Sequence, residues 1–208
     1  MAYRKTARTE ARKADIRRRL LDVARRLVAD GGFSALQIGT VAQLAGVAAG
    51  TVYRYFPSKA DLSAEVFHIV SQHEIDVAAE IARSGGPATE RLVAAIRAVA
   101  SRAVQGRITA YALIAEPADA EIDTQRLVHR RALARVFEEI LKDGTANGEF
   151  PKLNVEASAA CIVGAVMESL VNPLAPDSDG VGDDGSTFFD AVASFCLRGI
   201  LEDRVPRE

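Results

Sequence analysis

The chain has 208 residues, of which 49% are hydrophobic and 26% charged, enough apolar sequence for one sizeable core or for two small ones that share a long helix. This composition excludes a disordered chain, and no uncharged apolar run approaches the ~18 residues that a membrane span needs. The net charge of −2 hides a division, because residues 1–62 carry 12 Lys and Arg against 5 Asp and Glu, whereas residues 63–208 carry 14 against 23. A basic segment on an acidic remainder favours a polyanionic partner such as nucleic acid.

Nine helices and no sheet are expected, because apolar residues recur at spacings of three and four and no segment alternates with a period of two. The first ten residues are polar and basic, and we expect them to form a mobile arm in which Arg4, Lys5 and Arg8 can reach a phosphate or the minor groove. The predicted helices span about 13–30, 38–44, 49–56, 59–82, 88–104, 108–115, 120–142, 155–171 and 186–203.

Residues 38–56 have the form of a helix, a tight turn with a glycine, and a second helix, which is typical of a helix-turn-helix. Gly46 permits the backbone conformation of the turn, and Val47 fills the space between the two helices. The start of the second helix is poor in side chains, so its N-terminus and free amides can approach DNA closely. The residues concerned are Ala48, Ala49 and Gly50.

Thr51 and Tyr55 are four residues apart, so they share a helix face opposite Val52 and Phe56. Arg17, Arg18 and Arg19 lie off the apolar stripe of the first helix, where a solvated face is the simplest interpretation.

This pattern resembles the tetracycline-repressor (TetR) family of transcriptional regulators over about residues 13–62. The matching residues are Val41-Ala42, Ala45-Gly46-Val47, Gly50 to Phe56, Ser58-Lys59 and Leu62. The resemblance implies an all-α chain with a DNA-binding head at residues 1–60 and a helical effector-binding and dimerisation domain at 61–208. It implies that Tyr53 and Lys59 hold phosphates. The full set of implied DNA contacts is Thr40, Gln43, Ala48, Ala49, Gly50, Thr51, Tyr53, Arg54, Tyr55 and Lys59.

The sequence departs from that family at three positions near the helix-turn-helix. Gln37 stands where the family usually has a Ser or Thr cap, and Ala48 stands before the recognition helix where Ser or Thr is frequent. Gly39 replaces a residue that commonly contacts a phosphate. Direct base readout must then rest on few side chains, with a larger part for thymine methyl contacts and DNA shape.

The resemblance also implies a small-molecule pocket among the predicted helices four to eight. Candidates are polar or aromatic side chains on otherwise apolar stripes, together with a methionine, and the alternative for each one is an ordinary hydrogen-bonded core residue. The candidates are His73, Tyr111, His129, Phe137 and Met167. The acidic cluster of Glu116, Asp119, Glu121 and Asp123 is expected to complement a helix N-terminus.

The last two predicted helices carry dense apolar faces, and a four-helix bundle of two such pairs would form an isologous homodimer. Ala160 and Gly164 permit close helix approach. The predicted interface residues are Ile162, Val163, Val166, Leu170, Phe188, Val192 and Phe195.

The sequence therefore predicts a repressor that binds a palindromic double-stranded DNA operator as a homodimer and that a small apolar or amphipathic effector releases through the helix at 59–82. An adaptor protein with a basic N-terminus is the main alternative. An enzyme ranks last, because the three histidines lack metal spacing and no nucleophile–base pair, C-x-x-C or glycine fingerprint occurs. We expect no cofactor, no metal and no membrane partner. Without a signal-peptide pattern, and with Cys161 and Cys196 in apolar helices, a cytoplasmic location is expected.

Overall fold

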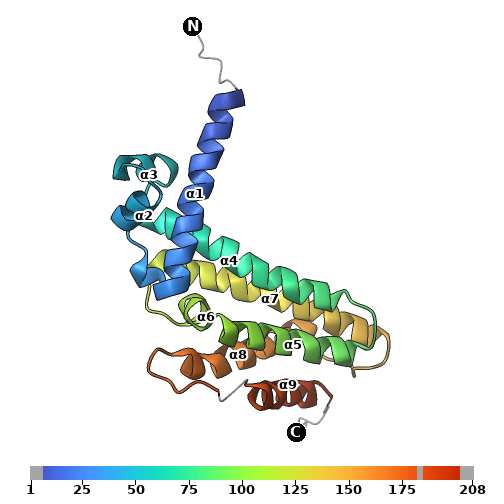
Figure 1. The fold of residues 1–208 in the computed structure, drawn as a ribbon. Coiled ribbons are helices and arrows are strands. Elements are labelled where there is room, and N and C mark those ends of the chain that lie inside the picture. Colours follow the sequence, from blue (N-terminus) through green and yellow to red (C-terminus); the bar gives the residue numbers. More distant parts are fainter. Residues whose placement is uncertain (1–6, 182–184, 202–208) are drawn as a thin grey trace.

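The computed structural model describes residues 7–181 and 185–201 (Figure 1). These residues form nine α-helices and one short 3-10 helix, with no β-strand among them, so the predicted all-α fold class is confirmed. Arg4 and Lys5 of the predicted arm, and the end of the last predicted helix, lie outside the described residues. The elements are α1 (Ala7–Gly31), η1 (Phe33–Ala35), α2 (Ile38–Leu44), α3 (Ala49–Tyr55), α4 (Lys59–Ala82), α5 (Ala88–Gln105), α6 (Arg107–Ile114), α7 (Ala120–Ala146), α8 (Val155–Leu174) and α9 (Ser186–Leu201).

Three helix ends differ from the sequence prediction by three residues or more. α1 begins at Ala7, so Arg8 belongs to the helix and not to a free arm. Ion pairs at helical spacing, such as Lys13–Glu10 at 3.4 Å, stabilise this polar first part of the helix. α7 continues through Gly144, which was predicted to stop it. α8 includes Pro173 in its last turn, although a proline has no N–H to donate to the carbonyl four residues earlier.

The head is built from α1, α2, α3 and the beginning of α4, and Figure 1 shows α2 and α3 side by side next to α1. Its core contains Leu20, Val41, Val52 and Leu62, none of which exposes any surface. The core does not end at the predicted boundary near residue 60, because side chains of α4, α6 and α7 complete it. Those later residues are Leu62, Val66, Phe67, Ala112, Leu113 and Ile122.

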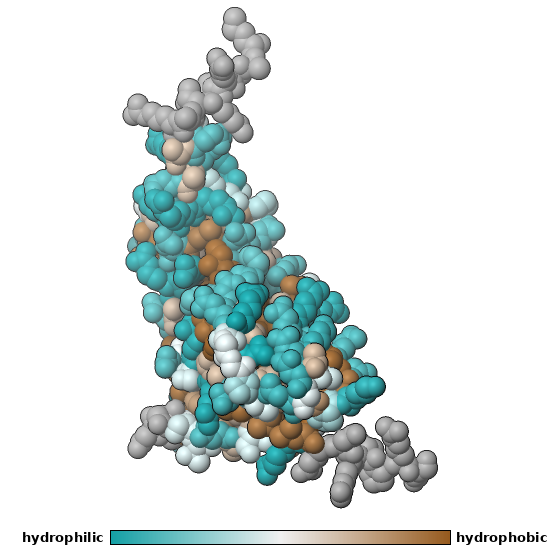
Figure 2. Space-filling model, turned by 90° about the vertical axis from the view of Figure 1, so that its right-hand side faces the viewer, coloured by the Kyte–Doolittle hydropathy of each residue, from teal (hydrophilic) through white to brown (hydrophobic). Residues whose placement is uncertain are grey.

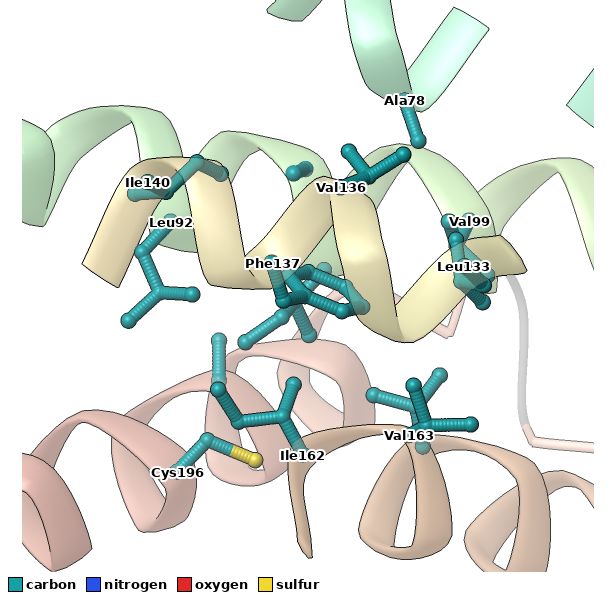
Figure 3. Packing of buried hydrophobic residues seen from close by; sticks show 14 of the residues in the cluster. Ala78, Leu92, Val99, Leu133, Val136, Phe137, Ile140, Ile162, Val163 and Cys196 are labelled. Atoms are coloured by element: carbon teal, nitrogen blue, oxygen red, sulfur yellow. The ribbon is translucent and has the colours of Figure 1, made fainter. Parts of the chain in front are cut away.

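The remaining helices pack around a second core in the body, which is the part of the chain from α4 to α9. α7 lies centrally against α4, α5 and α8. Figure 3 shows Phe137 of α7 pointing toward Ile162 and Val163 of α8, and Cys196 of α9 close to them. Among the described helices, α8 alone has the length and apolar composition of a membrane span. Its buried side chains, such as Ile162 and Val166, belong to the body core.

Gly144 offers a stability test, because a Cβ at this position would lie 2.2 Å from Cδ2 of Phe150 and 2.8 Å from Cβ of Ala88. We expect Gly144→Ala to lower the free energy of unfolding by about 1–3 kcal/mol through overpacking, although alanine is the better helix former. Gly39→Ala is the matched control, since α2 has open space around Gly39. It should leave stability unchanged or raise it by up to about 1 kcal/mol in urea denaturation. Equal effects of the two substitutions would contradict the packing assigned to Gly144.

Candidate nucleic-acid interface and body cavity

The turn between α2 and α3 is closed by the backbone, as a helix-turn-helix requires. Gly46 has a φ of +66°, a left-handed conformation that glycine adopts without strain, so its predicted role is confirmed. The Gly46 N–H donates to the Gln43 carbonyl at 3.2 Å, and the Val47 N–H donates to the Ala42 carbonyl at 3.0 Å. This pair of bonds forms a Schellman motif, which fixes the direction in which α3 leaves the turn.

Burial on one side of α3 determines which residues face solvent. Val52 is fully buried and Phe56 is 3% exposed, whereas Tyr53 is 51% exposed, unusually high for an aromatic side chain. Of the predicted DNA contacts, some are exposed and the rest are half-buried, so all of them retain accessible surface. Gln43, Ala48, Ala49, Gly50, Tyr53 and Arg54 are exposed; Thr40, Thr51, Tyr55 and Lys59 are half-buried.

A groove of about 600 Å³ separates α3 from the first part of α1. Thr51, Arg54 and Tyr55 line it from α3, and α1 contributes three cations on the other side. Sequence reasoning did not select these α1 residues as DNA contacts, because only the angle between α1 and α3 brings them to the helix-turn-helix. They are Arg12, Lys13 and Arg19.

Arg17 is exposed, as a solvated face predicts, and its side chain also contacts α4 and Phe56. Its guanidinium pairs with Glu65 of α4 at 2.8 Å and lies 5.3 Å from the ring centroid of Phe56. Arg18 and Arg19 both pair with Asp15 on their own helix and fit the solvated interpretation. Arg17 thus joins α1, α4 and the residue that ends α3.

Glu116 joins the head to the body. Its carboxylate accepts hydrogen bonds from the backbone N–H groups of Phe33 at 2.8 Å and Ser34 at 3.0 Å. Gly32 has a φ of +70°, and a Cβ there would lie 2.6 Å from Glu116 Oε2, so the close approach requires glycine. Glu116 thus complements the N-terminus of η1, whereas Glu121 and Asp123 lie in the first turn of α7.

Arg126 of α7 holds the segment that carries Glu116. Its guanidinium donates to the backbone carbonyls of Ala112, Leu113 and Glu116 and pairs with Asp123 at 2.8 Å. Arg126 thus fixes the C-terminal end of α6 and the connection to α7, from which Glu116 reaches the head.

A cavity of about 80 Å³, which we call the body cavity, lies among α4, α5, α6, α7 and α8. His129 and Met167, two of the predicted pocket residues, are in its lining. The other three are not: His73 is exposed on α4, Phe137 is fully buried in the body core, and Tyr111 lines a separate groove beside Glu116. The expectation that these three contact this cavity is wrong, because the helices turn His73 outward and fill the space around Phe137.

Arg102, Glu74 and His129 in the cavity wall differ in their hydrogen bonds and in their charge. Arg102 binds Glu74 through two hydrogen bonds, at 2.7 and 2.8 Å, and this contact raises the pKa of Arg102. Burial lowers the pKa of His129 to about 4, so its imidazole is neutral at pH 7. Sequence reasoning missed Glu74 and Arg102, since no local pattern connects two charged residues on different helices.

Four of the predicted dimer contacts are buried inside the protomer. Ile162 and Val163 are 3% and 4% exposed, and Val166 and Leu170 are fully buried, so these side chains have no surface for a partner and that prediction is wrong. Phe188 and Val192 are half-buried, and Phe195 is 65% exposed. The exposed face of α8 carries small residues instead, namely Ala157, Ala160, Cys161 and Gly164.

Comparison with known proteins finds two matching family profiles. "Bacterial regulatory proteins, tetR family" matches residues 20–66, which cover most of the head. "Tetracyclin repressor-like, C-terminal domain" matches residues 85–170, from the loop before α5 into α8.

Two curated relatives match over different lengths of the chain. The HTH-type transcriptional repressor KstR of Rhodococcus jostii is 52% identical over 46 residues, which is 22% of each chain, so the match spans under a quarter of that relative. The fatty acid metabolism regulator protein of Bacillus subtilis is 24% identical over 154 residues, 73% of this chain and 79% of that protein.

Among solved structures, the transcriptional regulator FadR from Bacillus subtilis in complex with stearoyl-CoA superposes with a TM-score of 0.71. It is 22% identical, and the superposition covers 88% of this chain and 98% of that one. NemR of E. coli in its reduced form gives 0.68 at 14% identity, covering 90% and 97%. At these identities the likeness is one of fold.

The contact between Glu116 and the head can be tested by amide hydrogen exchange. Glu116→Gln keeps the shape of the side chain but removes the charge and one of two equivalent acceptor oxygens. We expect the amides of Phe33 and Ser34 to exchange about tenfold faster, as for the loss of a charged hydrogen bond of about 1.5 kcal/mol. Glu80→Gln, at an exposed site on α4, is the control and should change neither amide. Unchanged exchange in both variants would rule out this contact.

Proposed function

The chain belongs to the tetR family of bacterial regulatory proteins, and from that premise we propose that it is a repressor whose head binds a DNA operator and whose body binds a releasing effector. The observation that carries the proposal is the surface of α3, where Tyr53 and Arg54 are exposed while Val52 is fully buried. A hydroxyl-bearing aromatic and a guanidinium on a short helix suit contacts to phosphates and base edges in a major groove. The 52% identity to the repressor KstR over 46 residues supports the proposal.

A homodimer would place two such heads on one duplex. The exposed faces of α8 and α9 support this arrangement. α8 exposes small residues such as Ala160 and Gly164, which permit close approach of a second copy, and α9 exposes the apolar side chain of Phe195. Figure 2 shows hydrophobic residues gathered at the lower end of the body, at the height where Figure 1 places α8 and α9. A two-fold axis through this face implies a palindromic operator with half-sites about one helical turn, or a multiple, apart.

Relief of repression would start in the body cavity. α6 lines this cavity through Thr109 and Leu113. Glu116, two residues beyond the end of α6, accepts a hydrogen bond from the head. α4 contributes Val70 and Glu74 to the wall and continues back to the head at Leu62. A ligand that shifts either helix changes the position of α3, and a coupling of about 1–3 kcal/mol would change operator affinity roughly 5- to 150-fold.

The effector is a small apolar or amphipathic molecule, as the mainly apolar wall of the cavity suggests. The complex of Bacillus subtilis FadR with stearoyl-CoA supports a hydrocarbon-containing ligand. Regulation of this kind places the protein in the cytoplasm, where bacterial DNA lies.

DNA binding is tested by fluorescence anisotropy with the duplex that flanks the protein's own gene, over a series of salt concentrations. Lys59→Ala should weaken binding about tenfold on every sequence and reduce the slope of log affinity against log salt by about 1, because one phosphate contact is lost. Arg130→Ala, which removes an exposed cation from α7, is the charge-matched control and should change neither quantity. If the unmodified protein ignores every duplex at low salt, the basic head serves another partner.

Dimer formation is tested by sedimentation equilibrium. Phe195→Glu should raise the dimer dissociation constant at least tenfold, because a buried carboxylate without a partner is costly. Leu127→Glu places the same charge on another exposed apolar residue, 56% exposed on α7, and should leave the dimer intact. A monomeric unmodified protein at micromolar concentration would refute the homodimer.

A further inference from the structure

The wall of the body cavity combines an apolar surface with few polar groups. Val99, Leu133, Met167 and Leu170 provide aliphatic and thioether surface from α5, α7 and α8. Such a wall favours a hydrocarbon ligand, because water gains little from contact with it.

The charged groups in the wall already satisfy each other. Arg102 uses two of its N–H donors on the two carboxylate oxygens of Glu74, so the pair contributes no net charge. An anionic ligand would have to compete with Glu74 for Arg102 and would be repelled by the same carboxylate. The wall therefore selects against a free carboxylate.

In the wall of the body cavity, His129 has a buried polar atom that the described residues leave unsatisfied. The residue is 8% exposed, and its buried Nδ1 has no hydrogen-bond partner among the described residues. Phe67 packs against the imidazole in a T-shaped arrangement, with ring centroids 6.2 Å apart and an interplanar angle of 79°. A buried polar atom without a partner is uncommon in folded proteins and marks a place where a ligand group gains a hydrogen bond without displacing a protein partner.

A hydroxyl is the ligand group that best fits this position. It can donate to an unprotonated Nδ1 or accept from a protonated one, so it suits either tautomer of a neutral imidazole. It also carries no charge into a wall whose only ion pair is already complete, as far as the described residues show.

We propose that the body cavity binds an uncharged, mainly hydrocarbon alcohol whose hydroxyl group hydrogen-bonds to His129. The inference rests on the proposed function, because it names the chemical class of the releasing effector. It assigns His129 as the residue that distinguishes an alcohol from a hydrocarbon of the same length.

Isothermal titration calorimetry on the full chain, without DNA, tests the assignment with three probes of equal chain length: 1-hexanol, hexanoate and 1-chlorohexane. We expect 1-hexanol to bind at least tenfold more tightly than hexanoate. His129→Phe should weaken 1-hexanol about tenfold, the effect of one buried hydrogen bond, and should leave 1-chlorohexane within about twofold. His73→Phe, at an exposed histidine on α4, is the matched control and should change no affinity.

His129→Gln is a second variant, in case His129→Phe does not fold. Its amide retains hydrogen-bonding groups, so it should preserve the preference for 1-hexanol over 1-chlorohexane. Tighter or equal binding of hexanoate, absence of 1-hexanol binding up to its solubility limit, or an unchanged preference in folded His129→Phe would each overturn the proposal.

Operator anisotropy with and without 1-hexanol separates this inference from the proposed function. If 1-hexanol binds through His129 but leaves DNA affinity unchanged, the binding site stands and the role of the alcohol as an effector is overturned. If the protein binds no DNA, the repressor function is overturned, and the calorimetric result still decides what the cavity binds.

Discussion

The shortness of α2 and α3 is the constraint on which the DNA-facing surface depends. Each helix has seven residues, about two turns, and an isolated helix of that length is unstable in water. Burial of Val41, Val52 and Phe56 against α1 and α4 supplies the missing stability. Because these side chains must face inward, the opposite side of α3 must face solvent. The exposure of Tyr53 therefore follows from the packing that holds the helix in place.

The same packing extends the head core into the body. Ala112 and Leu113 of α6 and Ile122 of α7 belong to the head core, although Leu113 also lines the body cavity. Two structural units that share side chains cannot move independently, since a well-packed core resists continuous deformation. The helix at 59–82 was the only connection considered from the sequence. Glu116 provides a second one, and its two hydrogen bonds to backbone N–H groups do not depend on the side chains of the head.

Local patterns predicted the helices and the helix-turn-helix, because apolar periodicity and the glycine of a tight turn act over a few residues. They did not predict which face of a helix another helix covers. His73 and His129 both lie on apolar stripes, and only the packing of α4 against α7 exposes one and buries the other. α8 is apolar on several faces, so the sequence did not distinguish the face used by the protomer core, with Ile162, from the one left outside, with Gly164.

The charge division of the sequence becomes a spatial division in the structure. Two acids of residues 1–62 pair with cations of the same helix, Glu10 with Lys13 and Asp15 with Arg18, so these charges cancel locally. Arg12, Arg54 and Lys59 have no acidic partner in the described part of the chain. Two of them, Arg12 and Arg54, line the groove between α1 and α3. Long-range attraction to a polyanion is therefore strongest at the groove, while the acidic body is repelled, so the field itself orients the head toward the duplex before any contact forms.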